Sequence, residues 1–201
     1  MLIRTLILSL LFSASSIAAD KPNILWITSE DNDYGWLGCY GNKEAQTPRL
    51  DKLAADGLLF KHAYSNAPVC AVARSTILNG AYAPTMGTQH MRSRHAIPKK
   101  FKPYVSYLKA QGYYCTNRSK TDYNFEGNDK AIWNACSRNA HYKTRPKDAP
   151  FFSIFNLTVS HESSLFSKKK KTGKTRLDPA KVTLRPYLPD LPGIRSDVAH
   201  Y

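Results

Sequence analysis

Residues 66–80 read NAPVCAVARSTILNG, and this stretch decides how the rest of the chain is interpreted. A turn-forming Asn-Ala-Pro leads into Cys70, an apolar and helix-compatible run follows, and Gly80 ends it. A helix that begins at about Cys70 places this thiol among free backbone N–H groups, at the positive end of the helix dipole. Arg74 is four residues on and lies on the same helical face. The stretch therefore suits a tetrahedral oxyanion such as sulfate or phosphate.

The length and the N-terminus bound the domain organisation. A chain of 201 residues is long enough for one domain with a sizeable core, or for part of a larger one. Residues 1–19 have the features of a signal peptide: Arg4, an apolar run over Leu6–Phe12, and small residues ending at Ala18 or Ala19. That run is too short to cross a membrane, and no second candidate span follows. We expect an exported protein, periplasmic or extracellular, without a stable membrane anchor.

The charge balance is strongly basic, with 29 Lys and Arg residues against 15 Asp and Glu residues. A run at Lys168–Lys171 is typical of a solvated loop, and its functional alternative is steering of an anionic substrate. The run lacks interleaved aromatic residues, so we expect no nucleic-acid partner.

The cysteines do not indicate a zinc or redox site, because no Cys-x-x-Cys pair is present. Export permits disulfides, and Cys39 paired with Cys115 or Cys136 stays open at this point.

Short apolar runs alternate with helical patterns along the chain. This alternation predicts an α/β sheet whose carboxyl ends form one active edge. The expected strands are residues 23–28, 58–63, 113–117 and 151–157, and the expected helices are residues 48–57, 70–80 and 103–112. Residues 83–100 are expected to be irregular, and the proline-rich part after Ser163 to have no closing element.

Polar side chains follow three of these strands. Glu30 and Asp31 come after the first, Lys120 after the third and His161 after the last. Adjacent carboxylates repel each other unless a cation neutralises them, and hard oxygen ligands suit Ca²⁺ or Mg²⁺. Each position also has an ordinary structural reading: a polar turn for the carboxylates, a solvated surface lysine, and a small buried hydrophobe for Cys70.

Taken together and in order, the motifs resemble the sulfatase family of the alkaline-phosphatase-like fold, from about Pro22 to Tyr201. They are Pro-Asn-Ile-Leu, Gly-Cys-Tyr-Gly, Thr-Pro-Arg-Leu-Asp-Lys-Leu-Ala, Asn-Ala-Pro-Val-Cys-x-x-x-Arg-Ser, Ser-Lys-Thr-Asp-Tyr-Asn-Phe and Ser-His-Glu. The resemblance implies a sheet flanked by helices, with residues 20–201 as the N-terminal part of a sulfatase catalytic domain that is incomplete at the C-terminus.

The resemblance also implies roles for individual residues. Cys70 matches the cysteine that a formylglycine-generating maturation enzyme oxidises to Cα-formylglycine, whose aldehyde hydrate is the nucleophile. Arg74 would hold this group, Lys120 would bind the sulfate group, and His161 would contact sulfate or act as a general acid. The implied Ca²⁺ ligands are Glu30, Asp31 and the modified Cys70.

The sequence departs from the family pattern in three respects. Val72 stands where the maturation motif has proline, and Asp122 stands where the family often has histidine. The second half of the metal site belongs to an Asp-His/Asn-Gly segment, which does not occur before Tyr201. The resemblance implies hydrolysis of sulfate esters or sulfamates, with a sulfated small molecule or glycan as substrate. The alternatives are a phosphoesterase of the same fold and an inactive anion-binding fragment.

Overall fold

The computed structural model of the chain describes residues 21–92, 94–127, 129–166 and 177–201. The expected signal peptide at residues 1–19 and the lysine run at 168–171 lie outside the described residues. The regular elements, in chain order, are β1 (Ile24–Ser29), η1 (Tyr34–Trp36), η2 (Gly38–Tyr40), α1 (Pro48–Asp56), α2 (Cys70–Asn79), α3 (Ala83–Met86), α4 (Tyr104–Ala110), β2 (Tyr114–Arg118), η3 (Asp129–Ile132), β3 (Ala135–Cys136), η4 (Tyr142–Thr144), β4 (Phe151–Leu157), η5 (Glu162–Phe166) and α5 (Pro192–His200).

The strands form one sheet in the order β1-β4-β2-β3, and every pairing is parallel. The strands expected at residues 23–28, 113–117 and 151–157 are confirmed as β1, β2 and β4. The fourth strand is the two-residue β3 instead of residues 58–63, so that prediction is wrong.

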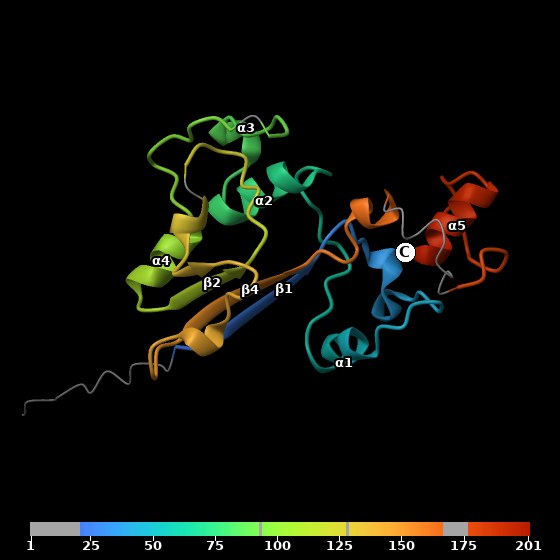
Figure 1. Ribbon diagram of the computed structural model, residues 1–201, viewed down its shortest axis with the longest axis horizontal. Coiled ribbons are helices and arrows are strands. Elements are labelled where there is room, and N and C mark those ends of the chain that lie inside the picture. Colours follow the sequence, from blue (N-terminus) through green and yellow to red (C-terminus); the bar gives the residue numbers. More distant parts are fainter. Residues whose placement is uncertain (1–20, 93, 128, 167–176) are drawn as a thin grey trace, which may run out of the picture.

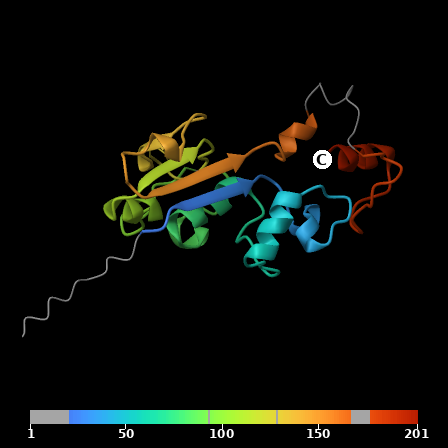
Figure 2. The same ribbon diagram turned by 90° about the horizontal axis from the view of Figure 1, so that it is seen from below.

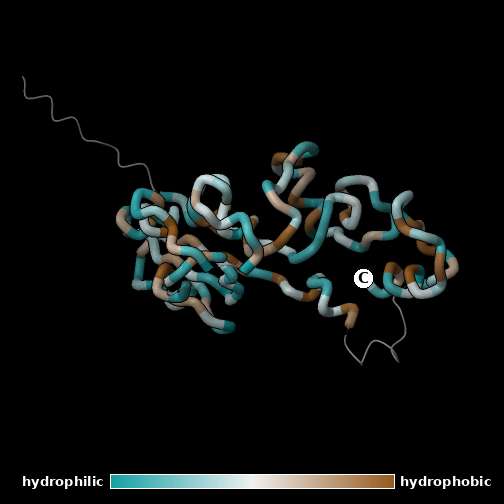
Figure 3. Tube along the Cα trace, turned by 90° about the horizontal axis from the view of Figure 1, so that it is seen from above, coloured by the Kyte–Doolittle hydropathy of each residue, from teal (hydrophilic) through white to brown (hydrophobic). Residues whose placement is uncertain are grey.

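Residues 58–63 do not form a strand, and two of their three large aliphatic or aromatic side chains up to Phe60 are largely exposed. Leu58 is 85% exposed and Phe60 is 68% exposed. Figure 3 shows apolar segments at the outside of the molecule, among them the end of η5 where the trace turns grey. The apolar character of residues 58–63 therefore could not by itself show whether they are buried.

The apolar run of β1 is typical of a buried strand, but none of its six residues is buried. Leu25 and Ile27 point to the same face, and both are 52% exposed. Trp26 points to the opposite face, where its ring stacks on Tyr104 at 6.2 Å and meets the edge of Phe152 at 6.3 Å. In the described sheet β1 pairs with β4 on one side only, so β1 is the edge strand.

The core lies on the Trp26 face of the sheet. Helices α2 and α4 cover this face, α3 lies beyond α2, and the short η4 lies against the other face (Figures 1 and 2). Trp133 stacks on Phe152 of β4 at 6.2 Å, and its indole N–H donates to the hydroxyl of Tyr123. The buried cluster comprises Leu78, Val105, Tyr113, Cys115, Tyr123, Phe125, Trp133, Phe152 and Ile154.

The three expected helices are all present, as α1, α2 and α4. The helix from Cys70 ends at Gly80, whose positive φ of 62° closes it as predicted. Thr47 precedes α1, but its hydroxyl does not cap the helix; it accepts from the N–H of Gly38 and donates to Asp51, both at 2.9 Å. Helices α3 and α5 contradict the expectation of irregular chain at residues 83–100 and after Ser163.

The C-terminal residues pack against the loop that follows β1 (Figure 1). The hydroxyl of Tyr201 donates to the carbonyl of Asp31 at 2.9 Å, and its ring lies 4.6 Å from that of Trp36. Arg185 forms an ion pair with Asp33 at 2.9 Å. This second cluster holds the acidic loop at the carboxyl end of the sheet.

The core predicts a large cost for truncating Trp133. Trp133→Ala removes a side chain that is 4% exposed and leaves a cavity, so we expect a loss of about 3–5 kcal/mol in the free energy of unfolding. The matched control is Tyr187→Ala, at a ring that is 72% exposed, with an expected change within about 0.5 kcal/mol. Urea denaturation followed by circular dichroism measures both, and equal losses would contradict this core.

Candidate active site

Three charged side chains meet at the carboxyl ends of β1 and β2. The ammonium group of Lys120 lies 2.5 Å from Oε2 of Glu30, and Arg74 Nη1 lies 3.7 Å from Oε1 of the same carboxylate. The Glu30 side chain is 6% exposed, and those of Arg74 and Lys120 are 14% and 16% exposed. A buried carboxylate needs such partners, because desolvation of an unpaired charge is costly.

Arg74 also fixes the backbone after β2. Its Nε and Nη2 each donate at 2.6 Å, to the carbonyls of Thr121 and Lys120. Asn117, which is fully buried, donates to the same Lys120 carbonyl at 3.0 Å. The loop that carries Lys120 is therefore held from both α2 and β2.

A row of hydrogen-bonded polar side chains crosses the sheet near its carboxyl end, next to these charged groups. Thr28 of β1 donates to the amide oxygen of Asn156 of β4 at 3.1 Å. The amide nitrogen of Asn156 then donates to Asn117 of β2 at 2.8 Å. This Thr28–Asn156–Asn117 row fixes the ends of three parallel strands relative to one another.

Cys70 is the first residue of α2 and contacts the same loop. Its thiol donates to Oδ2 of Asp122 at 3.3 Å. Burial raises the pKa of the Cys70 thiol, and so do the hydrogen bond to Asp122 and the charge of its carboxylate. Lys120 and the N–H of Ala71 lower this pKa, but the net shift is upward. The helix N-terminus is thus present as expected without making Cys70 a ready thiolate.

Asp31 and His161 form a neighbouring pair. His161 Nε2 lies 3.9 Å from Asp31 Oδ2, and the N–H of Ser163 donates to His161 Nδ1 at 3.2 Å. Because Nδ1 accepts, the proton of the neutral ring is assigned to Nε2. Asp31 has a positive φ of 48°, and its Oδ2 also accepts from the N–H of Glu162 at 2.8 Å.

The structure thus brings the predicted residues to one edge, although not all into direct contact. Arg74, Lys120 and Glu30 form one cluster, and Cys70 joins it through Asp122, two residues after Lys120. Among the described residues, no side-chain hydrogen bond or ion pair joins Cys70 to Arg74 or His161 to Lys120. All four cysteines have free thiols, so the disulfide left open by the sequence is not formed.

The sequence did not single out Arg92, Asn117 or Asn156. Arg92 lies in a stretch interpreted as surface loop, yet its Nη2 lies 3.2 Å from Asp122 Oδ2 and 3.8 Å from Cys70 Sγ. Asn117 and Asn156 lie within strands. A polar side chain in an otherwise apolar strand is the sequence feature that could have drawn attention to them.

The donor chemistry of Glu30 and Asp31 fits a calcium ion in type, since carboxylate oxygens are its usual ligands. The Glu30 carboxylate is nearly buried and is neutralised by two cations, so its surroundings favour positive charge. Among the described residues no group of three or more His, Cys, Asp or Glu side chains gathers to hold a metal. The two carboxylates would therefore supply part of a coordination shell.

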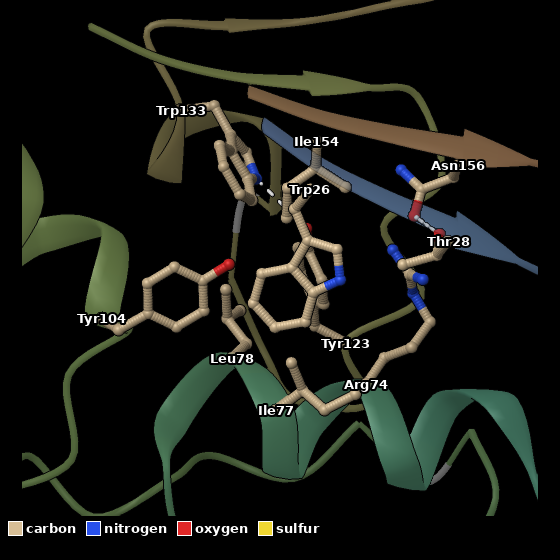
Figure 4. Close-up of a pocket in the computed structure, with 10 residues that line it drawn as sticks. All are labelled: Trp26, Thr28, Arg74, Ile77, Leu78, Tyr104, Tyr123, Trp133, Ile154 and Asn156. Atoms are coloured by element: carbon tan, nitrogen blue, oxygen red, sulfur yellow. Dashed lines mark hydrogen bonds between the residues drawn. The ribbon is translucent and has the colours of Figure 1, made fainter. Parts of the chain in front are cut away.

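A small apolar cavity lies behind this site, between α2 and the sheet (Figure 4). Its volume is about 40 Å³, close to that of one water molecule, so it cannot hold a sugar. Arg74 reaches from α2 past its rim toward Thr28 and Asn156 (Figure 4). The guanidinium also lies 5.7 Å from the ring centroid of Tyr123, which helps to fix it.

Comparison with known proteins decides the family. The family model described as Sulfatase matches residues 22–153. The chain belongs to the sulfatase family. An ulvan-active sulfatase of Formosa agariphila is 38% identical over 159 residues, covering 73% of this chain and 26% of that protein. Arylsulfatase A of Bos taurus is 38% identical over 110 residues, covering 53% and 22%. The chain thus spans about a quarter of the length of these curated sulfatases.

Solved structures confirm the alkaline-phosphatase-like fold of the sulfatases. A 2-O GAG sulfatase matches with a TM-score of 0.62 and 18% identity, over 85% of this chain and 41% of that one. A protein solved in complex with its substrate D-glucosamine-2-N,6-O-disulfate matches with a TM-score of 0.59 and 18% identity, over 70% and 35%. At this identity the likeness concerns the fold alone. In the described parts of this chain, no helix is long and apolar enough to cross a membrane.

The contact between Cys70 and Asp122 predicts a shift in thiol reactivity. Asp122→Asn removes the negative charge that raises the pKa of Cys70, so this pKa falls. Because the thiolate is the form that reacts, alkylation of Cys70 by iodoacetamide should rise at a lower pH than in the unchanged chain. Mass spectrometry of the Cys70 peptide separates this reaction from that of the other cysteines. Asp56→Asn on the exposed face of α1 is the control, and an equal or higher midpoint for Asp122→Asn would contradict the contact.

Proposed function

We propose that this chain carries the nucleophile-bearing part of a sulfatase active site, which hydrolyses sulfate esters or sulfamates on a sulfated carbohydrate. The observation that carries the proposal is the meeting of Cys70, at the start of α2, with the Glu30–Lys120–Arg74 cluster through the loop at residues 120–122. Membership of the sulfatase family supports the reaction class. The names of similar proteins, an ulvan-active sulfatase and a 2-O GAG sulfatase, support a carbohydrate substrate.

The environment of Cys70 favours a modified nucleophile over a thiolate. A catalytic thiolate needs a lowered pKa, whereas burial and Asp122 raise the pKa of this thiol. Conversion of Cys70 to Cα-formylglycine by a maturation enzyme removes that difficulty, because the hydrated aldehyde supplies hydroxyl groups for attack on sulfur. The first turn of α2 leaves backbone N–H groups directed at the same position.

Lys120 and Arg74 are suited to hold the sulfate group. Both are cationic, nearly buried and fixed by backbone contacts, so little ordering is needed when an anion binds. Glu30 would repel that anion, and Ca²⁺ held by Glu30 and Asp31 would offset this charge and polarise a sulfate oxygen. In this proposal Lys120 exchanges part of its contact with Glu30 for the oxygens of the sulfate.

His161 is placed to give a proton to the departing alcohol or amine. Its Nε2 carries the proton of the neutral ring, and its side chain is 25% exposed, so that nitrogen can meet a group arriving from solvent. Asp31 Oδ2 lies 3.9 Å from this nitrogen, on the same side of the ring.

The expected setting of this reaction is outside the cytoplasm. The signal-like residues 1–19 support export to the periplasm or beyond, and export would bring the protein to polymeric sulfated substrates. The maturation enzyme is a necessary partner before or during export in this proposal.

The central experiment combines mass spectrometry of the Cys70 peptide with turnover of 4-nitrophenyl sulfate. The proposal predicts formylglycine at position 70 after co-expression with a maturation enzyme. It also predicts that Cys70→Ala lowers turnover by about 10³-fold or more, because a covalent nucleophile is lost. Cys39→Ala, at another half-buried cysteine, is the control. Faster turnover of 4-nitrophenyl phosphate would instead favour a phosphoesterase.

A second arm addresses Val72, since an unmodified Cys70 could reflect poor recognition by the maturation enzyme. Val72 is the third residue of α2, where the backbone N–H has no partner within the helix and proline is tolerated. Val72→Pro should raise the modified fraction of Cys70. A fully modified but inactive chain would favour the anion-binding fragment instead.

A further inference from the structure

The segment that carries the nucleophile position is unusually basic. Residues 57–121 contain no Asp or Glu, whereas acidic residues occur on both sides of this interval. Such a distribution gives one part of the molecule a positive field, which concentrates anions near it. The basic residues of the interval are Lys61, Arg74, Arg92, Arg94, Lys99, Lys100, Lys102, Lys109, Arg118 and Lys120.

Part of this segment is fixed beside Cys70. Asn124, which is 5% exposed, donates through its amide nitrogen to the carbonyls of Thr88 at 2.7 Å and His90 at 2.8 Å. The N–H of Glu126 donates to the carbonyl of His95 at 3.0 Å. Thr88, His90 and His95 are thereby attached to the chain that follows Lys120.

This attachment places Arg92 next to Cys70, on the solvent-exposed side of the site. Its Nη2 contacts Asp122 Oδ2 at 3.2 Å and Cys70 Sγ at 3.8 Å, while its side chain is 61% exposed. Both contacts use one nitrogen, and the other guanidinium nitrogens have no hydrogen-bond partner among the described residues. Asp122 thus orients Arg92 and leaves most of its donors directed to solvent.

We propose that Arg92 forms a second anion subsite, which binds a further sulfate or a carboxylate on the sugar that carries the scissile sulfate or on its neighbour. This inference rests on the proposed function and names its substrate class as saccharides with at least two anionic groups. The Sγ atom of Cys70 marks where the reacting group lies, so an anion on Arg92 lies beside the scissile sulfate.

A role limited to neutralising Asp122 explains less of the geometry. If Arg92 served only to neutralise Asp122, its side chain would need neither its high exposure nor its contact with Cys70. A planar guanidinium with free donors can bind sulfate or carboxylate in a two-pronged manner. Asp122 supplies orientation at one edge, and the opposite edge is left for the substrate.

The first test is binding, measured by titration calorimetry on the chain with unmodified Cys70. We expect D-glucosamine-2-N,6-O-disulfate to bind roughly tenfold or more tightly than glucosamine 6-O-sulfate, the scale of one charged hydrogen-bonded contact. Arg92→Met should abolish this preference, and Arg92→Lys should retain part of it. Arg138→Met, an exposed arginine beyond β3, makes the same change in net charge and should keep the preference. A monosulfated glucosamine linked to a uronate tests carboxylate as the second anion in the same way.

The outcomes separate this inference from the proposed function. 4-Nitrophenyl sulfate carries one anionic group. Its turnover therefore tests sulfate hydrolysis in the absence of the second anion that Arg92 is proposed to bind. Equal affinity of the unchanged chain for mono- and di-anionic sugars, or an unchanged preference in Arg92→Met, would overturn the subsite while hydrolysis stands. Absence of both turnover and sugar binding would overturn the proposed function and the subsite with it.

Discussion

The buried carboxylate of Glu30 is the constraint on which the rest of the site depends. It lies at the end of an edge strand, it is nearly inaccessible to water, and it is neutralised by Lys120 and Arg74. Removing either cation would leave charge in a place where water cannot compensate for it. These contacts therefore require the carboxyl ends of β1 and β2 and the N-terminal part of α2 to meet at the same point in space. That requirement gathers the reactive residues.

The polar row across the sheet shows how this convergence is maintained. The face of the sheet that carries Trp26 and Ile154 near its middle carries Thr28, Asn156 and Asn117 at its carboxyl end. Apolar packing against α2 and α4 fixes the middle of the sheet, and the amide hydrogen bonds fix the strand register at its carboxyl end. Asn117 and Arg74 then share the Lys120 carbonyl, so an error in register would move the ammonium group away from Glu30.

The sequence predicted much of this arrangement and failed where tertiary contacts decide. The strands β1, β2 and β4 and the helices α1, α2 and α4 followed from apolar runs with turn residues at their ends. Residues 58–63 have the same composition but no sheet neighbour, and Leu25 and Ile27 lie on an uncovered face; a short window shows neither fact. The strand-end residues Glu30, Lys120 and His161 were predicted because parallel strands share one carboxyl edge. Arg92 and its Asp122 contact were not, since they depend on the path of an irregular loop.

A double-mutant cycle on Glu30 and Lys120 tests the central claim most directly. The free energies of unfolding would be measured for Glu30→Gln, Lys120→Met and the double variant. Lys120→Met leaves Glu30 with only Arg74 to neutralise it, and Glu30→Gln leaves Lys120 without its carboxylate. We therefore predict a loss of up to about 3–5 kcal/mol for Lys120→Met and a coupling energy of at least about 1 kcal/mol, with the double variant more stable than the sum of the singles implies. Losses that add to within about 0.5 kcal/mol would contradict the claim that this ion pair organises the strand ends.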